Sequence, residues 1–515
     1  MGKYIAGIDI GTTGAKTIIF DLEGNKVSSA YREYKCYYPN PTWVEQDPVE
    51  LVEAAMWSCK QAIANAGLEA SEILSVGFSP QRSCSIFLDE NEKPLKMLSW
   101  QDNRAGEEVQ KIHEMIDPRE LTRISGLVMS TTWILPKLMW VRKNDPELWG
   151  KAKRIVQLHD YLLHCFGAED YYLSETDAGF YGCWDVNKVT WSEELSRLFD
   201  MDLSRISTIK PTGAHIGSIC KEAAEKTGLR EGLPLCVGAG DQSSAALGAG
   251  IIHNGDASAS FGTGGMCIIC LDEAKYDITN SFFTTNHVIS GKWEWEGIQN
   301  ASACIFRWFR DEIAAMENEQ AQKEGCDVYD KLSEIAATVP AGSRGLVVMP
   351  HFAGSGSPRW DSNARGAILG LTLAHDRACL TRAFMEAVVM EQRDMMENAK
   401  KNGLEISKVR IMGGPTKSEV WNQIQADIYG VNVETLKVPD ASVLGAAIVG
   451  AVGSGIFASF EEAVERLVKV DQVYTPNPEN TRKYNQIYKI YCGAYQGLKE
   501  SGAYQMISEF QSKFA

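Results

Sequence analysis

A carboxylate stands where an apolar strand gives way to a helix rich in small residues. The sequence GAGDQSS occupies residues 238–244 and contains Asp241. Small neighbours let a ligand approach the backbone closely, and a carboxylate in such a place can accept a proton from a hydroxyl group. An ordinary helix N-cap would also explain an aspartate at this position. The segment therefore leaves both a general base and a helix cap open.

Two turns rich in glycine and threonine, each between apolar strands, present groups that can bind phosphate. The first lies within IDIGTTGAK at residues 8–16, and the second within FGTGG at residues 261–265. Successive backbone N–H groups in such turns form a concave nest for phosphate oxygens. Either turn alone could be a plain hairpin connection, whereas two in corresponding places would clamp a polyphosphate. The candidate phosphate-binding residues are Gly11, Thr12, Thr13, Gly262 and Thr263.

Charged residues flank the first turn. Asp9 ends the strand before it, and its carboxylate can hold Mg²⁺ through water, because this hard cation prefers oxygen ligands. Lys16 follows the turn and can offset phosphate charge. The turn matches neither the GxGxxG dinucleotide fingerprint nor the Walker A loop. A nucleotide held here would therefore be bound by a different kind of loop.

Polar and aromatic side chains follow two strands of the N-terminal half, within SPQRSC at residues 79–84 and WQDNR at residues 100–104. Tryptophan offers a face for the C–H surface of a sugar, and the polar side chains offer fixed hydrogen bonds to hydroxyls. A surface loop with a packed tryptophan is the alternative. The candidate substrate contacts are Gln81, Arg82, Trp100, Asp102 and, beside Asp241, Gln242.

Small residues gather again in GGPTKS at residues 413–418 and in ASVLGAA at residues 441–447. A flat adenine ring could lie against such a surface, although tight helix packing would use the same residue types. The candidate adenosine-side residues are Gly413, Gly414 and Ser418.

The elements that must position these motifs follow a repeated order. Strands are predicted at Tyr4–Ile10 and at residues 16–21, 26–35 and 73–78, with one helix before the last of them. Asp47 can cap that helix, Pro48 suits its first position and Gly67 ends it. Strands predicted at residues 235–240, 256–261 and 266–271 repeat the pattern weakly. The order suggests an α/β fold with a duplicated RNase-H/actin-type domain and a boundary near residues 245–255.

Bulk composition excludes several classes of protein. Acidic residues exceed basic ones by 67 to 51 among 515 residues, which disfavours nucleic-acid binding. No apolar run approaches the ~20 residues that span a bilayer, and Asp9 interrupts the N-terminal apolar run too early for a signal peptide. We therefore expect no membrane or nucleic-acid partner and a cytoplasmic location. The 13 cysteines are interpreted as structural thiols, including the pair at residues 267 and 270.

The chain resembles the FGGY carbohydrate kinases over nearly its full length, because motifs of that family occur here in family order. The matching segments are IDIGTTGAK, SWQDNRA, LPKLMWVRKN, GAGDQSSAALGAG, SFGTGGM, SPRWDSNARGAILGLTL, IMGGPTKSEVWNQIQAD and ASVLGAAIVGAVGSGIF. The resemblance implies two RNase-H/actin-like ATPase domains with an interdomain cleft that holds ATP and Mg²⁺. Residues 1–250 would form the domain with the sugar-binding side and the first phosphate loop, and residues 251–515 the nucleotide-binding domain.

By the same match, Asp241 resembles the catalytic base of the family, and Asp9 and Asp241 lie where the metal is held. Substrate choice depends on departures from the family pattern. Gln81-Arg82-Ser83 stands where xylulose-specific members usually carry Met-His-Gly and glycerol-specific members Arg-Glu. Ser83 in place of a carboxylate favours a ketopentose, as in xylulokinases, over glycerol. Another polyol, a hexulose or an autoinducer-type substrate is the alternative.

Two rival functions share these loops. An actin- or chaperone-like ATPase would not need Asp241 beside a polar pocket, and it would carry a separate peptide-binding domain. A catalytically dead sensor would not need to retain both Asp9 and Asp241. The expected partner is a small sugar or polyol, and a homodimer is the candidate assembly.

Overall fold

Short runs of apolar residues near the N-terminus build a four-stranded sheet. The computed structural model describes residues 3–514, and its first sheet has the strand order β3-β2-β1-β4. The strands are β1 (Tyr4–Ile10), β2 (Gly14–Asp21), β3 (Lys26–Glu33) and β4 (Ile73–Pro80). β1 and β4 run parallel with Asp9 opposite Ser79. The turn after β1 and the loop after β4 therefore lie at the same edge of the sheet.

Helix α1 (Pro48–Ala66) packs against β2 and β3 and begins and ends where the sequence predicts. The Asp47 carboxylate accepts a hydrogen bond from the Val49 N–H at 2.9 Å, which satisfies one of the free donors of the first turn. Gly67 follows the helix with a φ of +64°, a left-handed conformation that favours glycine. The predicted cap, first residue and end of this helix are confirmed.

The C-terminal half contains a seven-stranded sheet with the order β16-β17-β15-β14-β20-β21-β22. Its strands are β14 (Ala257–Phe261), β15 (Gly265–Leu271), β16 (Phe283–Asn286), β17 (Trp293–Gln299), β20 (Lys408–Gly413), β21 (Asn432–Leu436) and β22 (Val470–Tyr474). β14 and β20 are parallel neighbours with Phe261 opposite Gly413. Both Cys267 and Cys270 are buried in β15, as expected for structural thiols.

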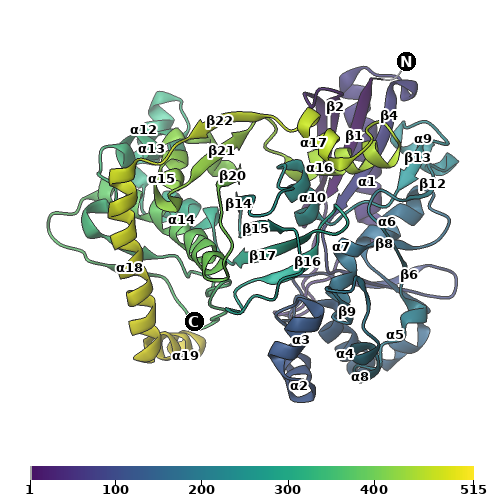
Figure 1. Cartoon of the computed structure of the whole chain (residues 1–515), viewed down its shortest axis with the longest axis horizontal. Coiled ribbons are helices and arrows are strands. Elements are labelled where there is room, and N and C mark those ends of the chain that lie inside the picture. The colour runs from purple at the N-terminus through teal and green to yellow at the C-terminus, as the bar shows by residue number, and fades with distance from the viewer. Residues whose placement is uncertain (1–2, 515) are drawn as a thin grey trace.

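Two short helices join the halves. α10 (Asp241–Gly248) packs against α16 (Ala441–Gly453), and α16 also lies on β1 and β4 of the first sheet (Figure 1). A Cβ on Gly445 would lie 1.8 Å from the carbonyl oxygen of Ser244, so the close approach of α10 and α16 requires glycine there. The small residues of ASVLGAA therefore serve tight helix packing, which was the alternative to an adenine surface. The domain boundary near residue 250 stays a prediction.

Each sheet, with the elements around it, forms one lobe of the molecule. The remaining elements cover the two sheets and extend the first lobe, which contains the four-stranded sheet (Figure 1). In the first lobe they include β5 (Ser85–Leu88), β6 (Pro94–Leu98), β7 (Arg154–Val156), α2 (Gly106–Met115), α3 (Pro118–Ser125), α4 (Ile134–Asn144), α5 (Pro146–Lys151), α6 (Leu158–Phe166), β8 (Tyr172–Ser174), α7 (Glu175–Ala178), α8 (Glu193–Leu198), α9 (Lys221–Thr227) and β13 (Pro234–Cys236). In the second half they include α11 (Ala303–Glu312), α12 (Ala315–Glu324), α13 (Val328–Ala337), α14 (Arg377–Lys401), α15 (Glu419–Tyr429), α17 (Phe460–Leu467), α18 (Pro478–Glu500) and α19 (Ala503–Phe514).

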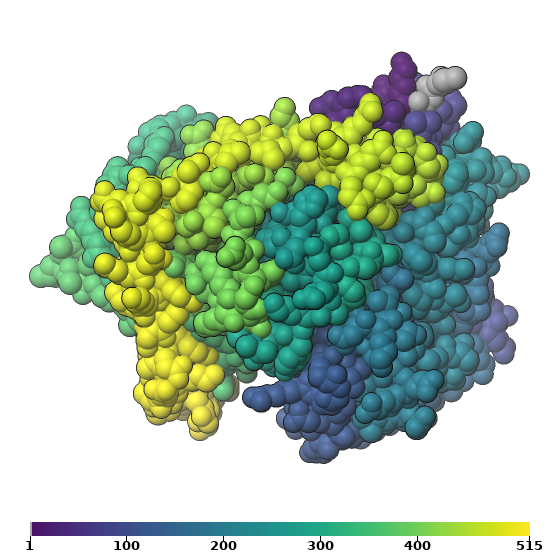
Figure 2. Space-filling view, in the orientation of Figure 1, coloured from purple at the N-terminus to yellow at the C-terminus, as the bar shows by residue number. Residues whose placement is uncertain are grey.

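Each lobe has its own apolar core, and a further apolar cluster connects them. That cluster brings Ile5 and Phe20 of the first sheet against Leu444 of α16 and Leu467 of α17. Figure 2 shows the C-terminal segment, in yellow, running across the top of both lobes before it ends in α18 and α19. Within residues 3–514, no helix combines the length and apolar character needed to cross a bilayer.

Candidate active site

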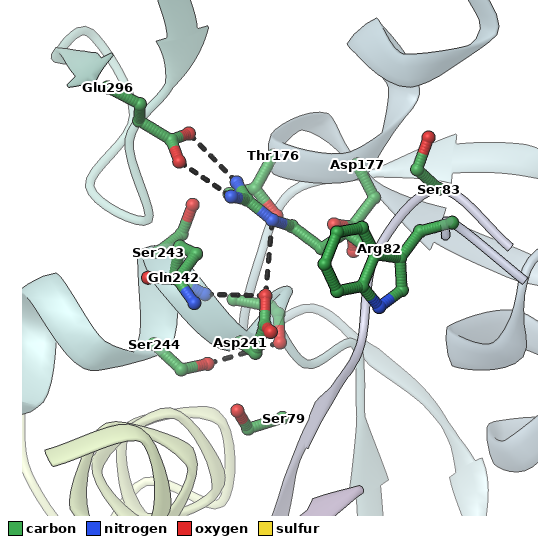
Figure 3. A network of polar contacts seen from close by, with 12 residues as sticks. Ser79, Arg82, Ser83, Thr176, Asp177, Asp241, Gln242, Ser243, Ser244 and Glu296 are labelled. Atoms are coloured by element: carbon green, nitrogen blue, oxygen red, sulfur yellow. Dashed lines mark hydrogen bonds and ion pairs between the residues drawn. The ribbon is translucent and has the colours of Figure 1, made fainter. Parts of the chain in front are cut away.

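Asp241 is the first residue of α10, and its side chain points toward Arg82 of the loop after β4 (Figure 3). Its Oδ1 accepts a hydrogen bond from the Gln242 N–H at 2.8 Å and lies 3.2 Å from Nε of Arg82. The side chain is 28% exposed, so it remains accessible. Burial raises the pKa of the Asp241 carboxyl, while the charge of Arg82 opposes that rise. Both contacts use Oδ1, which leaves Oδ2 available to a ligand.

Arg82 connects the lobes. Its two terminal nitrogens donate to the two carboxylate oxygens of Glu296 at 2.8 and 2.6 Å, across 214 residues of sequence. Glu296 lies on β17 and also accepts a hydrogen bond from Thr285 Oγ1 at 2.7 Å. Burial alone would lower the pKa of Arg82, but Glu296 outweighs it, with smaller contributions from Asp241 and Asp177, and the pKa is raised. Arg82 is therefore a fixed cation at the centre of an acidic cluster (Figure 3).

Asp9 lies at the end of β1, where its Oδ1 accepts a hydrogen bond from Ser79 Oγ at 2.8 Å. Burial and, to a smaller extent, the negative charge of Asp241 together raise the pKa of the Asp9 carboxyl to about 7, although the hydrogen bond from Ser79 opposes the rise. Two carboxylates that repel each other in this way favour a bound cation between them. The donor set of two oxygens also matches the one or two carboxylates by which proteins usually hold Mg²⁺ beside phosphates.

Replacing Asp9 with asparagine is expected to stabilise the protein without nucleotide or divalent metal, and more so at high pH. The folded protein binds the Asp9 proton more tightly than the unfolded chain, so ionisation of Asp9 opposes folding. This cost is absent below the ordinary pKa of 3.8, grows as pH rises, and is complete above about 7. The gain in Tm from Asp9→Asn should therefore be larger at pH 8 than at pH 4. An equal gain at both pH values would contradict the prediction.

The turn at Gly11–Thr13 is hydrogen-bonded by side chains of the same lobe. Trp100 Nε1 donates to Thr12 Oγ1 at 3.1 Å, and Gln46 Nε2 donates to the Thr12 carbonyl at 3.0 Å. Gln81 is buried and donates through its amide to Gln46 Oε1 at 2.8 Å. Gln81 and Trp100 were predicted as substrate contacts, and the structure gives both a role in supporting the turn that carries Thr12.

Protein donors hold the carboxylate of Asp102 inside its own lobe. Its side chain is fully buried, its Oδ1 accepts from Arg104 Nε at 2.9 Å, and its Oδ2 accepts from the Val44 N–H at 2.7 Å. A terminal nitrogen of Arg104 donates to Oδ2 at 2.8 Å, and the Arg104 N–H donates to Oδ1 at 3.1 Å. Because protein donors occupy both oxygens, the structure argues against the predicted substrate contact and makes Asp102 an anchor for its own loop.

Two predicted nucleotide contacts also have protein partners. Lys16 Nζ forms an ion pair with Asp440, the residue before α16, and this pair ties the first sheet to the C-terminal half. Ser418 caps α15 by accepting a hydrogen bond from the Trp421 N–H at 3.2 Å, and its hydroxyl lies 2.8 Å from that of Ser333. The Ser418 hydroxyl therefore stabilises the helix, which the sequence pattern at this position also allowed.

The second turn and the adenosine-side turn lie together, because β14 and β20 are adjacent parallel strands. Gly262 and Thr263 are exposed after β14, and Gly413 and Gly414 follow directly at the end of β20. Gly413 has a φ of +99°, and a Cβ there would lie 2.2 Å from the Phe261 carbonyl oxygen. A Cβ on Gly414 would meet no atom within 4 Å, which leaves open space beside the turn.

The sequence reasoning missed the acidic residues that complete the cluster. Glu294 and Glu296 point from β17, and Glu294 accepts a hydrogen bond from Ser243 Oγ at 3.0 Å. Asp177 is buried beside Arg82, with its Oδ2 2.6 Å from His159 Nδ1. Charged residues at alternate positions of the aromatic strand WEWEGIQ were the signal that could have found the two glutamates.

Comparison with known families decides the identity. Residues 4–248 match the N-terminal domain of the FGGY family of carbohydrate kinases, and residues 257–454 match its C-terminal domain. The chain belongs to this family. It is therefore a sugar kinase.

Several FGGY kinases with different substrates are similarly close to this chain. A xylulose kinase of Staphylococcus epidermidis is 28% identical over 97% of both chains, and a gluconokinase of Bacillus subtilis is 28% identical over 99% of both. An autoinducer-2 kinase of Salmonella typhimurium is 29% identical over 96% of this chain and 94% of its own. Such similar identities do not select a substrate, so the choice must come from the site.

The fold of the FGGY kinases is also that of the structure. A ligand-bound xylulose kinase from Lactobacillus acidophilus superposes with a TM-score of 0.89, at 24% identity, over 98% of this chain and 99% of its own. The predicted α/β architecture of two actin-like ATPase domains is confirmed.

Proposed function

We propose that this FGGY kinase transfers the γ-phosphoryl group of ATP to a hydroxyl of a neutral sugar, with a ketopentose as the first candidate. The observation that carries the proposal is the geometry of Asp241. Arg82 and the Gln242 N–H fix its Oδ1, and its Oδ2 stays available at the partly exposed junction of the lobes. A carboxylate oriented in this way can align an acceptor hydroxyl and accept its proton.

The residues present fit ATP and Mg²⁺. The turns at Gly11–Thr13 and Gly262–Thr263 would contact the phosphates, and the open space beside Gly414 would take the adenosine. Asp9 and Asp241 would hold Mg²⁺, which when bound would neutralise phosphate charge. Lys16 contributes by holding Asp440 and thus the first turn's sheet against α16.

The chain's own residues then act by positioning more than by covalent chemistry. The Asp241 Oδ2 accepts the hydroxyl proton as the new oxygen–phosphorus bond forms, and ADP leaves with the electrons of the broken bond. Arg82 favours the ionised form of Asp241, because its positive charge opposes the rise that burial causes in the pKa of this carboxyl. Closure of the lobes around the acceptor would exclude water as a competing acceptor.

The charge of the site favours a neutral acceptor over an anionic one such as gluconate. Arg82 already binds Glu296 through both terminal nitrogens, so that edge of its guanidinium is not free for a substrate carboxylate. Asp241 and Asp177 add negative charge beside it. Two like charges about 4 Å apart cost about 4 kcal/mol at the effective dielectric near a protein surface. A carboxylate on the acceptor would therefore be repelled by the carboxylates already in the site.

A coupled ADP-release screen tests this proposal. D-xylulose and other pentuloses, hexuloses, tetritols, glycerol and D-gluconate would be compared under the same conditions. We expect the best neutral ketose to exceed gluconate by at least about tenfold in kcat/KM, a difference of about 1.4 kcal/mol. Faster turnover of gluconate or of glycerol than of every ketose would contradict the choice of substrate. The absence of turnover with any acceptor would contradict the kinase proposal itself.

The more specific expectations drawn from the sequence stay predictions. They are the domain boundary near residue 250, the cytoplasmic location, a homodimer and the alternatives of another polyol, a hexulose or an autoinducer-type substrate. The rival ATPase function predicts ATP hydrolysis that no sugar stimulates, so the same screen separates it from the kinase.

A further inference from the structure

A lysine is fully buried behind the acceptor side of the site. Lys137 lies on α4 with no exposed surface. Its ammonium donates to backbone carbonyls and not to a carboxylate: to Thr132 at 2.7 Å, and to Ser83 and Trp100 at 3.4 Å. Burial lowers the pKa of Lys137 to about 8, while Cys84 and Asp102 oppose that fall. Burying a cation in this way costs folding free energy that an apolar side chain would not cost.

The three carbonyls belong to three separate segments of the acceptor side. Ser83 follows Arg82 directly, and the indole of Trp100 donates to Thr12 in the first turn. Thr132 precedes α4, and its carbonyl also accepts the Ser83 hydroxyl at 2.8 Å. One ammonium therefore fixes the loop after β4, the loop after β6 and the approach to α4 with respect to one another.

Ser83 is the strained member of this set. Its φ is +61°, a left-handed conformation that is uncommon for residues other than glycine and that clusters at functional sites. Its N–H donates to Gln157 Oε1 at 3.1 Å, its hydroxyl donates to Thr132, and its carbonyl accepts from Lys137. All of its polar groups are thus bonded, which holds the turn that aims Arg82 at Asp241 and Glu296.

We propose that Lys137 is a positioning residue for the acceptor, acting through the Ser83 turn and the Trp100 loop. The proposal rests on the proposed function only in taking the Arg82 side of the cleft as the acceptor side. A shift of about 1 Å in such a supporting group can cost about 10²-fold in rate. The turns after β14 and β20 do not touch these three segments, and the Gly11–Thr13 turn meets them through the bond from Trp100 to Thr12. Nucleotide affinity should therefore depend on Lys137 much less than acceptor kinetics do.

The test compares Lys137→Met with Lys143→Met. Methionine keeps an unbranched stem but cannot donate hydrogen bonds, and Lys143 lies on the same helix with a 52% exposed side chain. We expect Lys137→Met to lower kcat/KM for D-xylulose, or for the best neutral acceptor of the screen, by about 10- to 100-fold. The KM for ATP and the Kd for ADP should stay within about twofold, and Lys143→Met should match the wild type. Unchanged acceptor kinetics in Lys137→Met would overturn the proposal.

Ser83→Ala keeps the test decisive if Lys137→Met folds poorly. It leaves Lys137 in place and removes only the hydroxyl bond to Thr132. A selective, several-fold loss in acceptor kcat/KM would support the proposal, and unchanged acceptor parameters would overturn it. A proportional loss of acceptor kinetics and ADP binding in both variants would show a structural role alone and would equally overturn it. Wild-type protein that phosphorylates no acceptor would instead contradict the proposed function, before any variant is compared.

Discussion

Replacing Asp241 with asparagine is expected to abolish most phosphoryl transfer while leaving ATP binding intact. Asparagine is nearly isosteric, and its amide oxygen can still accept the Gln242 N–H. The variant loses the charge that accepts the hydroxyl proton, and general-base assistance is typically worth ~10²–10⁴-fold in rate. Steady-state ADP release would measure kcat, and calorimetric titration with ADP would measure nucleotide affinity.

Asp471→Asn is the matched control, because Asp471 is exposed on β22 away from the cleft and should leave both measurements unchanged. If Asp241→Asn keeps more than about half of wild-type turnover, Asp241 is not the base. If it loses nucleotide affinity as well, the carboxylate contributes chiefly to holding the metal and nucleotide.

Local sequence patterns predicted the parts of the site that neighbouring residues determine. The turn at Gly11–Thr13 follows from two apolar strands around small residues, and α1 follows from its cap and its terminal glycine. The juxtaposition of Gly262 with Gly413 comes from the pairing of β14 and β20 as adjacent parallel strands, which no local pattern predicted. The start of a helix at Asp241 was predicted correctly, but the strand expected at residues 235–240 is shorter, because β13 ends at Cys236.

What the sequence could not predict depends on partners far apart in the chain. Arg82 meets Glu296 across 214 residues, and Lys16 meets Asp440 across 424, so no local pattern contains either pair. Asp102 shows the opposite limit. Its residue type suggested a ligand contact, but only the fold reveals that Arg104 and the Val44 N–H already occupy its oxygens. Residue type shows what a side chain can bond, whereas the fold determines which bonds remain free.

Replacing Arg82 with alanine is expected to reduce acceptor kcat/KM by about 10²- to 10³-fold, with the KM for ATP unchanged within about twofold. The variant removes the group that fixes Asp241 Oδ1, and it leaves Glu296 buried without its bidentate partner. Breaking a buried ion pair from one side typically costs about 3–5 kcal/mol, because the remaining charge is uncompensated. Steady-state kinetics with separate acceptor and ATP titrations would measure the effect. Unaltered acceptor parameters would show that Arg82 does not belong to the acceptor side.

A double-mutant cycle with Glu296→Gln separates the two consequences of losing Arg82. Glutamine removes the charge of Glu296 but can still accept the bond from Thr285, so Arg82→Ala/Glu296→Gln no longer leaves a buried unpaired carboxylate. We expect the double variant to recover stability relative to Arg82→Ala, with a coupling of about 1–3 kcal/mol in unfolding free energy. Its acceptor kcat/KM should stay low, because Asp241 still lacks the guanidinium that orients it. If kcat/KM recovers together with stability, Arg82 acts only as a tie between the lobes, and Asp241 must be oriented by the Gln242 N–H alone.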